Sequence, residues 1–388
     1  MTTISHTHDL GALVWNRTTP VIGLRTLLQL AAVYVCSRSL ILMLGMMSPA
    51  VVEPGQFAKG PNSYALSTTF LRWDCGWYLS IIRNGYSFSP TEQSSVNFFP
   101  AFPQIARSLH LLGLDPVAAG YLVSNLACFA ACVLLWMLAR DLYGPVIAWN
   151  SVLFFLVGPV TFFFSTIYSE SMFLLSVVAL FYAAQQRRWA WAGLFGMFAA
   201  LSRSPGLLLV VPLLVEFLQI QPRRPYMTWP AQKWKIVFCF GPAAGLGIYM
   251  LYLWSACGNP LAFLVAASHW GRAITYPWRS VAHAFHYPDI YRAWFLTALV
   301  LAWLLCGLGC RQKLRTSHLV FVGMMILFYM SASFLEALPR YLSVLFPFYI
   351  CLGRLAYDRP RLFWPLVAGS CGLLALSITM FVNGYWFT

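Results

Sequence analysis

A single carboxylate, Asp74, stands among aromatic and basic residues in the first polar stretch of the chain. It lies in the segment LRWDCGWYLSIIRNGY, residues 71–86, between Arg72 and Arg83 and directly after Trp73. A carboxylate in such a setting can take a proton from an attacking hydroxyl, which is general base catalysis. The alternative is structural: Asp74 caps an interfacial helix, or it pairs with Arg72 or Arg83. The segment by itself leaves both interpretations open.

Arginine residues recur later in the chain at the edges of apolar runs. Arg203 falls in the motif LSRSPG, Arg272 in HWGR and Arg340 in LPRY. Guanidinium groups donate paired hydrogen bonds to phosphate oxygens, and a charge near hydrocarbon is costly unless it has a partner. One base-like carboxylate together with these arginines predicts a site for an anionic, phosphate-bearing substrate. The plainer alternative for Arg340 is that it reaches to lipid headgroups.

The composition indicates the elements that must position these residues. The 388 residues are 60% hydrophobic and 17% aromatic, and only 9% are charged. No soluble core of this size needs so few charges, so we expect an all-α polytopic membrane protein that forms a single domain over residues 1–388. The apolar runs predict about eleven transmembrane helices. They span residues 24–47, 116–139, 144–163, 171–186, 189–202, 205–220, 236–255, 293–310, 318–334, 341–356 and 363–383.

Basic residues orient these helices in the membrane. With the N-terminus inside, the short inner loops hold most of the Lys and Arg, which accounts for the net charge of +14 without a nucleic-acid partner. The two long loops, 48–115 and 256–292, then face outward. We expect the first to contain two amphipathic helices at the membrane interface, one over residues 71–83 and one that begins at the prolines near residue 102. Site chemistry is therefore expected on the outer face.

The short crossings 189–202 and 205–220 meet at LSRSPG, where Pro205 and the following glycine break the helix next to Arg203. Broken helices at membrane depth are tolerated only where they line a cavity or are buried in protein. Glu170, in the motif FFFSTIYSES, begins another crossing. A carboxylate there has a plain alternative role, because it favours a helix N-terminus through the macrodipole.

The order of these motifs resembles the PIG-V family of mannosyltransferases. WDxxWYLxIxxxGY, FFPxFP, FxSxxYSES, a Ser-Arg-Ser-x-Gly break, CGNPLAF with the later HWGR, and PRYLxVLFP follow one another between Leu71 and Phe348. The resemblance implies a GT-C glycosyltransferase fold and an inverting transfer on the outer or lumenal face. It implies a polyprenyl-phosphate sugar donor, usually dolichyl-phosphate mannose, and a glycan or glycolipid acceptor. Asn97 stands where alanine is commoner and Pro205 where asparagine is commoner, which leaves the acceptor's identity open.

The resemblance also implies roles for individual residues. Asp74 corresponds to the acidic residue of the first outer loop and is expected to be the general base. Arg340, followed by Arg203 and Arg272, is expected to hold the donor phosphate. Substrate contacts are expected from Trp73, Tyr168, Glu170, His269, Trp270 and Tyr341. We expect no cofactor and no metal, because a lipid phosphate leaves as a stable anion and the sequence shows no metal-ligand spacing.

Two other function classes remain open at this stage. A lipid or solute transporter would need ionisable groups deep in several crossings, and only Arg38 is clearly within one. A non-catalytic protein that binds a lipid-linked sugar would keep the same fold. The short inner loops favour the plasma membrane of a bacterium over the endoplasmic reticulum.

Overall fold

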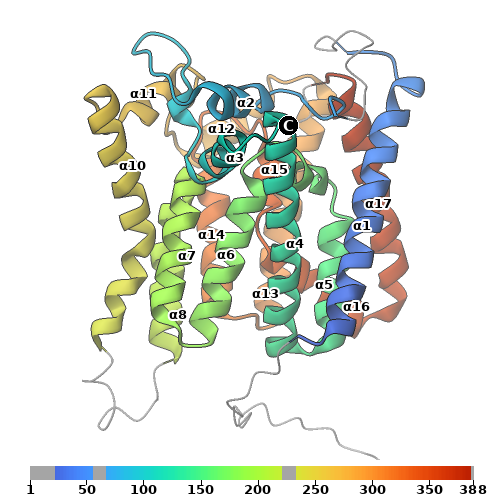
Figure 1. Cartoon of the computed structure of the whole chain (residues 1–388). Helices are drawn as coiled ribbons and strands as arrows, with labels where there is room; N and C mark the ends of the chain where they lie inside the picture. Colours follow the sequence, from blue (N-terminus) through green and yellow to red (C-terminus); the bar gives the residue numbers. More distant parts are fainter. Residues whose placement is uncertain (1–21, 56–66, 221–232, 386–388) are drawn as a thin grey trace, which may run out of the picture.

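The computed structural model describes residues 22–55, 67–220 and 233–385, and regular structure within these ranges is helical. The long helices run side by side, and a layer of short helices crosses one end of the bundle, the upper end in Figure 1. The longer transmembrane helices are α1 (Leu24–Met47), α4 (Pro116–Tyr143), α10 (Gly241–Cys257), α13 (Asp289–Arg311) and α17 (Phe363–Val382). Within the described residues, five helical segments are long and apolar enough to cross a membrane alone.

Shorter apolar helices complete the bundle. They are α5 (Pro145–Leu156), α6 (Glu170–Gln185), α7 (Trp189–Ser202), α8 (Val210–Ile220), α14 (Thr316–Met330) and α16 (Pro347–Asp358). Phenylalanines fill the space between α4, α5 and α6, among them Phe154, Phe155, Phe164, Phe173 and Phe181. Because lipid is as apolar as these side chains, close packing rather than exclusion of water stabilises such a bundle.

The layer across the upper end contains α2 (Cys75–Asn84), α3 (Ala101–Leu111), α11 (Ala262–Ser268), α12 (Pro277–Ala284) and α15 (Leu338–Leu342). Short 3₁₀ helices connect it to the bundle: η3 (Ser95–Asn97), η4 (Thr161–Ser165) and η5 (Ser204–Leu209), while η6 (Lys233–Phe240) precedes α10. The two predicted amphipathic helices correspond to α2 and α3. The turns between α6 and α7 and between α13 and α14, which hold Arg187 and Lys313, lie at the opposite end (Figure 1). The predicted topology also places Arg17, Arg223 and Arg224 in inner segments, and these three residues lie outside the described ranges.

Three expected helix boundaries were wrong, each for a local reason. The helix expected over 71–83 begins only at Cys75, because Trp73 adopts the left-handed conformation with φ of 52°. The crossing expected over 144–163 is broken after Leu156, shortly before Pro159. The crossing expected over 341–356 is divided: α15 ends at Leu342, and a new helix, α16, begins at Pro347, a residue that favours the first position of a helix.

Candidate active site

A cavity of about 480 Å³ lies between the layer of short helices and the neighbouring ends of α6, α7 and α14. Its walls come from segments far apart in the sequence. They include the start of α2, the end of η3, the break between α7 and η5, the segment after α11 and the segment from α14 to α15. A cavity formed by so many elements places chemically different side chains around one volume.

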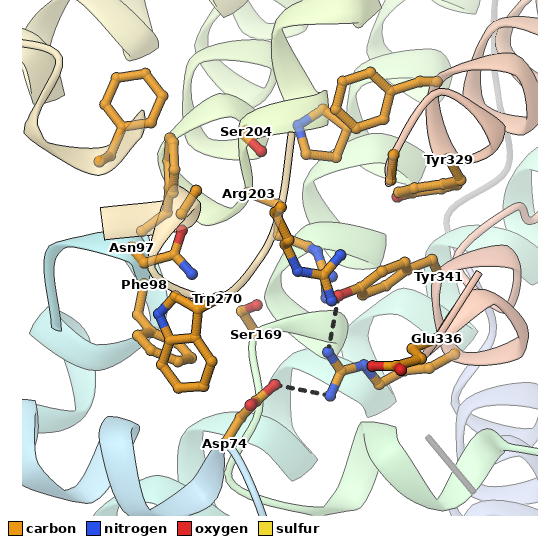
Figure 2. Close-up of a pocket in the computed structure, with 18 of the residues that line it drawn as sticks. Asp74, Asn97, Phe98, Ser169, Arg203, Ser204, Trp270, Tyr329, Glu336 and Tyr341 are labelled. Carbon is orange, nitrogen blue, oxygen red and sulfur yellow. Dashed lines mark hydrogen bonds and ion pairs between the residues drawn. The ribbon is translucent and has the colours of Figure 1, made fainter. Parts of the chain in front are cut away.

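Four charged side chains form a continuous chain of ion pairs on one side of the cavity. Arg340 Nη1 donates to Asp74 Oδ2 at 2.9 Å, and Arg340 Nε lies 3.2 Å from Glu170 Oε1. Arg203 Nη1 pairs with the same Glu170 oxygen. Glu170 and Arg340 are buried, whereas the Asp74 side chain keeps 27% of its surface exposed. The buried members fix one another, and Asp74, the most exposed of the four, points into the cavity that all four line (Figure 2).

Local backbone features explain how these residues reach the cavity. Asp74 immediately precedes α2, and Glu170 is the first residue of α6. Arg203 directly follows the last residue of α7 and has an extended backbone with φ of −156°, so its side chain leaves the helix. Gly206 lets η5 lie directly on α7, because a Cβ there would stand 2.5 Å from the backbone of Ala199.

Three guanidinium groups surround the phenol of Tyr341. The guanidinium carbons of Arg203, Arg340 and Arg272 lie 4.8, 5.0 and 5.5 Å from its ring centre. Arg340 Nη2 also donates to the Tyr341 hydroxyl at 3.2 Å, as Figure 2 shows. Cations over an aromatic face are stabilised by its quadrupole. The ring therefore holds three positive charges close together on one wall, which we name the arginine wall: Arg203, Arg272 and Arg340.

A further carboxylate, Glu336, lines the cavity in the connection between α14 and α15. Burial raises its pKa, and the neighbouring Tyr287, Arg272 and His283 oppose that rise. Glu336 has no recognisable signal in the sequence, because a lone acid outside a helix belongs to no spacing pattern. Only its position in the folded chain brings it beside Arg272.

The opposite wall is aromatic. Asn97, Phe98 and Trp270 lie together on the side facing the arginine wall, with Asp74 and Ser169 between the two (Figure 2). The Trp270 ring centre is 5.9 Å from that of Phe98 and 5.3 Å from that of Trp77. We name this second surface the aromatic wall: Asn97, Phe98 and Trp270.

A family model for mannosyltransferase (PIG-V) matches residues 27–257, more than half of the chain. The chain belongs to the PIG-V mannosyltransferase family. No curated protein matched the sequence. The family assignment confirms the resemblance seen in the motifs.

Solved structures show the fold of this PIG-V family member. The crystal structure of ArnT from Cupriavidus metallidurans bound to undecaprenyl phosphate is similar, with a TM-score of 0.54 and 13% identity over 92% of this chain and 76% of that one. The apo structure of ArnT gives a TM-score of 0.51 with 14% identity, over 91% and 76%. Archaeal oligosaccharyltransferase AglB from Archaeoglobus fulgidus, in complex with an inhibitory peptide and a dolichol-phosphate, gives 0.43 with 11% identity, over 93% and 56%. The fold is that of the GT-C glycosyltransferases, and the protein is a multi-pass membrane glycosyltransferase.

The structure of this PIG-V family member brings most of the predicted site residues together. Those that line the cavity are Asp74, Tyr168, Glu170, Arg203, Trp270, Arg272, Arg340 and Tyr341. Trp73 and His269 do not line it: Trp73 packs against the hydrophobic cluster beneath α2, and His269 Nε2 lies 3.0 Å from the carbonyl oxygen of Pro90. The Tyr168 hydroxyl donates to the carbonyl oxygen of Arg72 at 3.1 Å.

The structural alternative for Asp74 was right about pairing with arginine and wrong about the partner. The carboxylate pairs with Arg340, 266 positions away, and makes no side-chain cap to α2. Among the described residues, no group of three or more His, Cys, Asp or Glu side chains is arranged to hold a metal ion.

Proposed function

We propose that this PIG-V family member transfers a mannosyl group from a polyprenyl-phosphate donor to a hydroxyl of a glycan or glycolipid acceptor, with inversion at the anomeric carbon. The observation that carries the proposal is the contact between Asp74 and Arg340 in a cavity that also holds Arg203 and Arg272. A carboxylate and three guanidinium groups around one volume support a proton acceptor beside phosphate-binding groups. ArnT, which shares the fold, was crystallised with undecaprenyl phosphate, and that supports a lipid phosphate as the leaving group.

The chemistry follows from the two groups. The acceptor oxygen attacks the anomeric carbon while its proton passes to Asp74, and the bond from that carbon to the phosphate oxygen breaks in the same step. The electron pair stays on the phosphate, whose added charge is stabilised by Arg340, Arg203 and Arg272. Without substrate, Asp74 and Arg340 form an ion pair with each other. A donor phosphate that binds Arg340 releases the carboxylate to accept a proton.

The remaining lining fits a lipid chain and an outward orientation. Apolar residues from three different elements, Leu207, Leu246 and Phe328, continue the cavity away from the charged groups and provide a surface for the polyprenyl tail. The cavity lies at the end of the bundle opposite the basic α6–α7 and α13–α14 turns. Because basic loops stay in the cytoplasm, we assign the site to the outer face. The short inner loops favour a bacterial plasma membrane.

Turnover with a defined donor tests the proposal. The purified protein in nanodiscs is given undecaprenyl-phosphate mannose with mannose-containing acceptors, and release of undecaprenyl phosphate and formation of a mannosylated product are measured together. We expect equal amounts of both products. Because the transfer inverts the anomeric carbon, an α-linked donor should give a β-linked product, and a β-linked donor an α-linked product. Movement of the lipid or sugar across vesicles without transfer would instead establish a transporter, and binding without turnover would establish a non-catalytic protein.

A further inference from the structure

We infer that the aromatic wall is the acceptor subsite, that it binds a pyranose ring, and that Asn97 helps to select which sugar is accepted. The inference rests on the proposed function and extends it, since it assigns a recognition role to residues outside the charged cluster. It draws on the positions of Asn97, Phe98 and Trp270 across the cavity from the arginines (Figure 2).

The direction of attack places the acceptor on this wall. In a single inverting displacement the nucleophile approaches the anomeric carbon from the side opposite the leaving group. The phosphate leaves towards the arginine wall, so the acceptor hydroxyl must approach from the facing side. Asp74 lies between the two walls and is therefore close to the path of that hydroxyl.

The chemistry of the wall matches a sugar ring better than an extended alcohol. One face of a pyranose presents C–H groups, which pack on an aromatic ring, while its edge presents hydroxyls. Trp270 and Phe98 line the cavity and provide aromatic surface for this packing. The polar partner for a ring hydroxyl on this wall is Asn97.

Asn97 adds a directional polar group to the same wall. Its side-chain amide forms no hydrogen bond with the rest of the described chain, so both its donor and its acceptor are available to the cavity. Such a pair distinguishes a hydroxyl at one ring position from an amine or a hydrogen, because a mismatched substituent leaves the amide unpaired. An alanine at this position would offer only a methyl group.

The backbone that carries Asn97 is fixed on both sides. The hydroxyl of Tyr249 donates to the carbonyl oxygen of Val96 at 2.7 Å, and the hydroxyl of Tyr86 donates to that of Phe98 at 2.6 Å. Tyr249 is itself fully buried. Two tyrosine anchors around one free amide hold that amide in place before the acceptor arrives, which lowers the entropic cost of binding.

The test compares acceptors and variants at saturating undecaprenyl-phosphate mannose in nanodiscs. The acceptor probes are the methyl glycosides of mannose, glucose, galactose and glucosamine, with hexanol as a hydroxyl compound that has no ring. We expect transfer to at least one glycoside and none to hexanol. In Asn97→Ala the acceptor KM rises about 3- to 12-fold and the order of preference among the glycosides changes. The donor KM stays within about twofold of the wild-type value.

Trp270 provides a second, graded test. Trp270→Ala is expected to raise the acceptor KM roughly 10- to 100-fold, and Trp270→Phe, which keeps a smaller aromatic ring, roughly 3- to 10-fold. The phenylalanine variant retains the packing against Trp77, so it reports on binding if the alanine variant is unstable. Trp278→Ala is the matched control, since Trp278 is 65% exposed on α12 and lies outside the cavity lining.

Hydrolysis of the donor by water separates the two proposals. If wild-type protein cleaves undecaprenyl-phosphate mannose and the Asn97 and Trp270 variants raise the donor KM instead of the acceptor KM, the aromatic wall binds the donor and this inference is overturned while the proposed function stands. Equal transfer to hexanol and glycosides also overturns it. If wild-type protein neither transfers mannose nor cleaves the donor, the proposed function fails, and this inference fails with it.

Discussion

Two buried ion-pair clusters lie at opposite ends of the helix bundle, and they differ in what their carboxylates face. At the end that holds the cavity, Asp74 uses Oδ2 to bind Arg340, and Oδ1 accepts no hydrogen bond from the described residues. At the other end Glu216 of α8 uses both oxygens, one paired with Arg315 and the other accepting from Ser317. Glu216 is 1% exposed, and it is not part of the cavity lining.

Whether a carboxylate oxygen is left without a protein partner distinguishes a chemical site from a structural one when the residue types are the same. A carboxylate whose two oxygens both have protein partners leaves neither oxygen free for a substrate. Removing that carboxylate leaves the charge of its partner unpaired. A carboxylate with one oxygen directed at an open volume can accept a proton. The Glu216 cluster connects α8 to the start of α14, whereas the Asp74 cluster faces a cavity.

The largest expected effect is on turnover in Asp74→Asn. The amide keeps the shape of the carboxylate but cannot accept a proton, so turnover should fall roughly 10²- to 10⁴-fold. Undecaprenyl phosphate release measures the loss, and thermal unfolding checks that the variant is folded. Asn84→Ala, at the exposed end of α2, is the control. Wild-type turnover in a folded Asp74→Asn protein would remove Asp74 from the mechanism.

Arg340→Lys should have the next largest effect, roughly 10²- to 10³-fold on turnover, because lysine keeps the charge but loses the forked geometry that contacts Asp74 and Glu170 together. The donor KM should rise as well. Arg279→Lys outside the cavity lining is the matched control. An unchanged donor KM in the Arg340 variant would contradict its assignment to the phosphate.

Glu216→Ala should lower stability and leave turnover unchanged, the reverse of the Asp74 and Arg340 variants. Loss of the carboxylate leaves Arg315 without its partner, and since that arginine is 22% exposed we expect about 2 kcal/mol of lost stability rather than the full cost of a buried charge. Turnover per folded molecule should stay at the wild-type level. A thermal unfolding series and an activity assay on the same samples measure both. A large drop in turnover without a loss of stability would mean that the Glu216 cluster takes part in the reaction.

The smallest expected effect concerns pH and Glu336. Burial raises its pKa in the folded protein, so the folded state binds more protons than the unfolded state between the ordinary and the raised value. Stability contributed by this group is therefore present at lower pH and falls as pH rises through that window. Glu336→Gln should remove the dependence, which unfolding curves of both proteins at several pH values will reveal. Parallel curves would show that Glu336 titrates as an ordinary surface acid.

Much of the fold could be predicted from the sequence because membrane insertion depends on local composition. Apolar runs of bilayer length, prolines at the breaks and glycine after α2 placed most helices, and the motif order indicated the PIG-V family. The boundaries that were missed depend on single residues, such as Trp73 with its positive φ. No hydrophobic pattern encodes that conformation, because it results from how the turn packs in the folded chain.

The amino-acid pattern alone was enough to predict a multi-pass membrane protein whose charges gather in a few polar breaks, and to indicate which of those charges are suited to phosphate and proton transfer. The pairing of Asp74 with Arg340, and not with its neighbours Arg72 and Arg83, follows from the folded chain, as do the position of Glu336 in the cavity and that of Asn97 across from the arginines. Composition and spacing act over one helix at a time, whereas these contacts join segments hundreds of residues apart. They depend on how the helices pack, and that packing decides which charge remains open to a substrate.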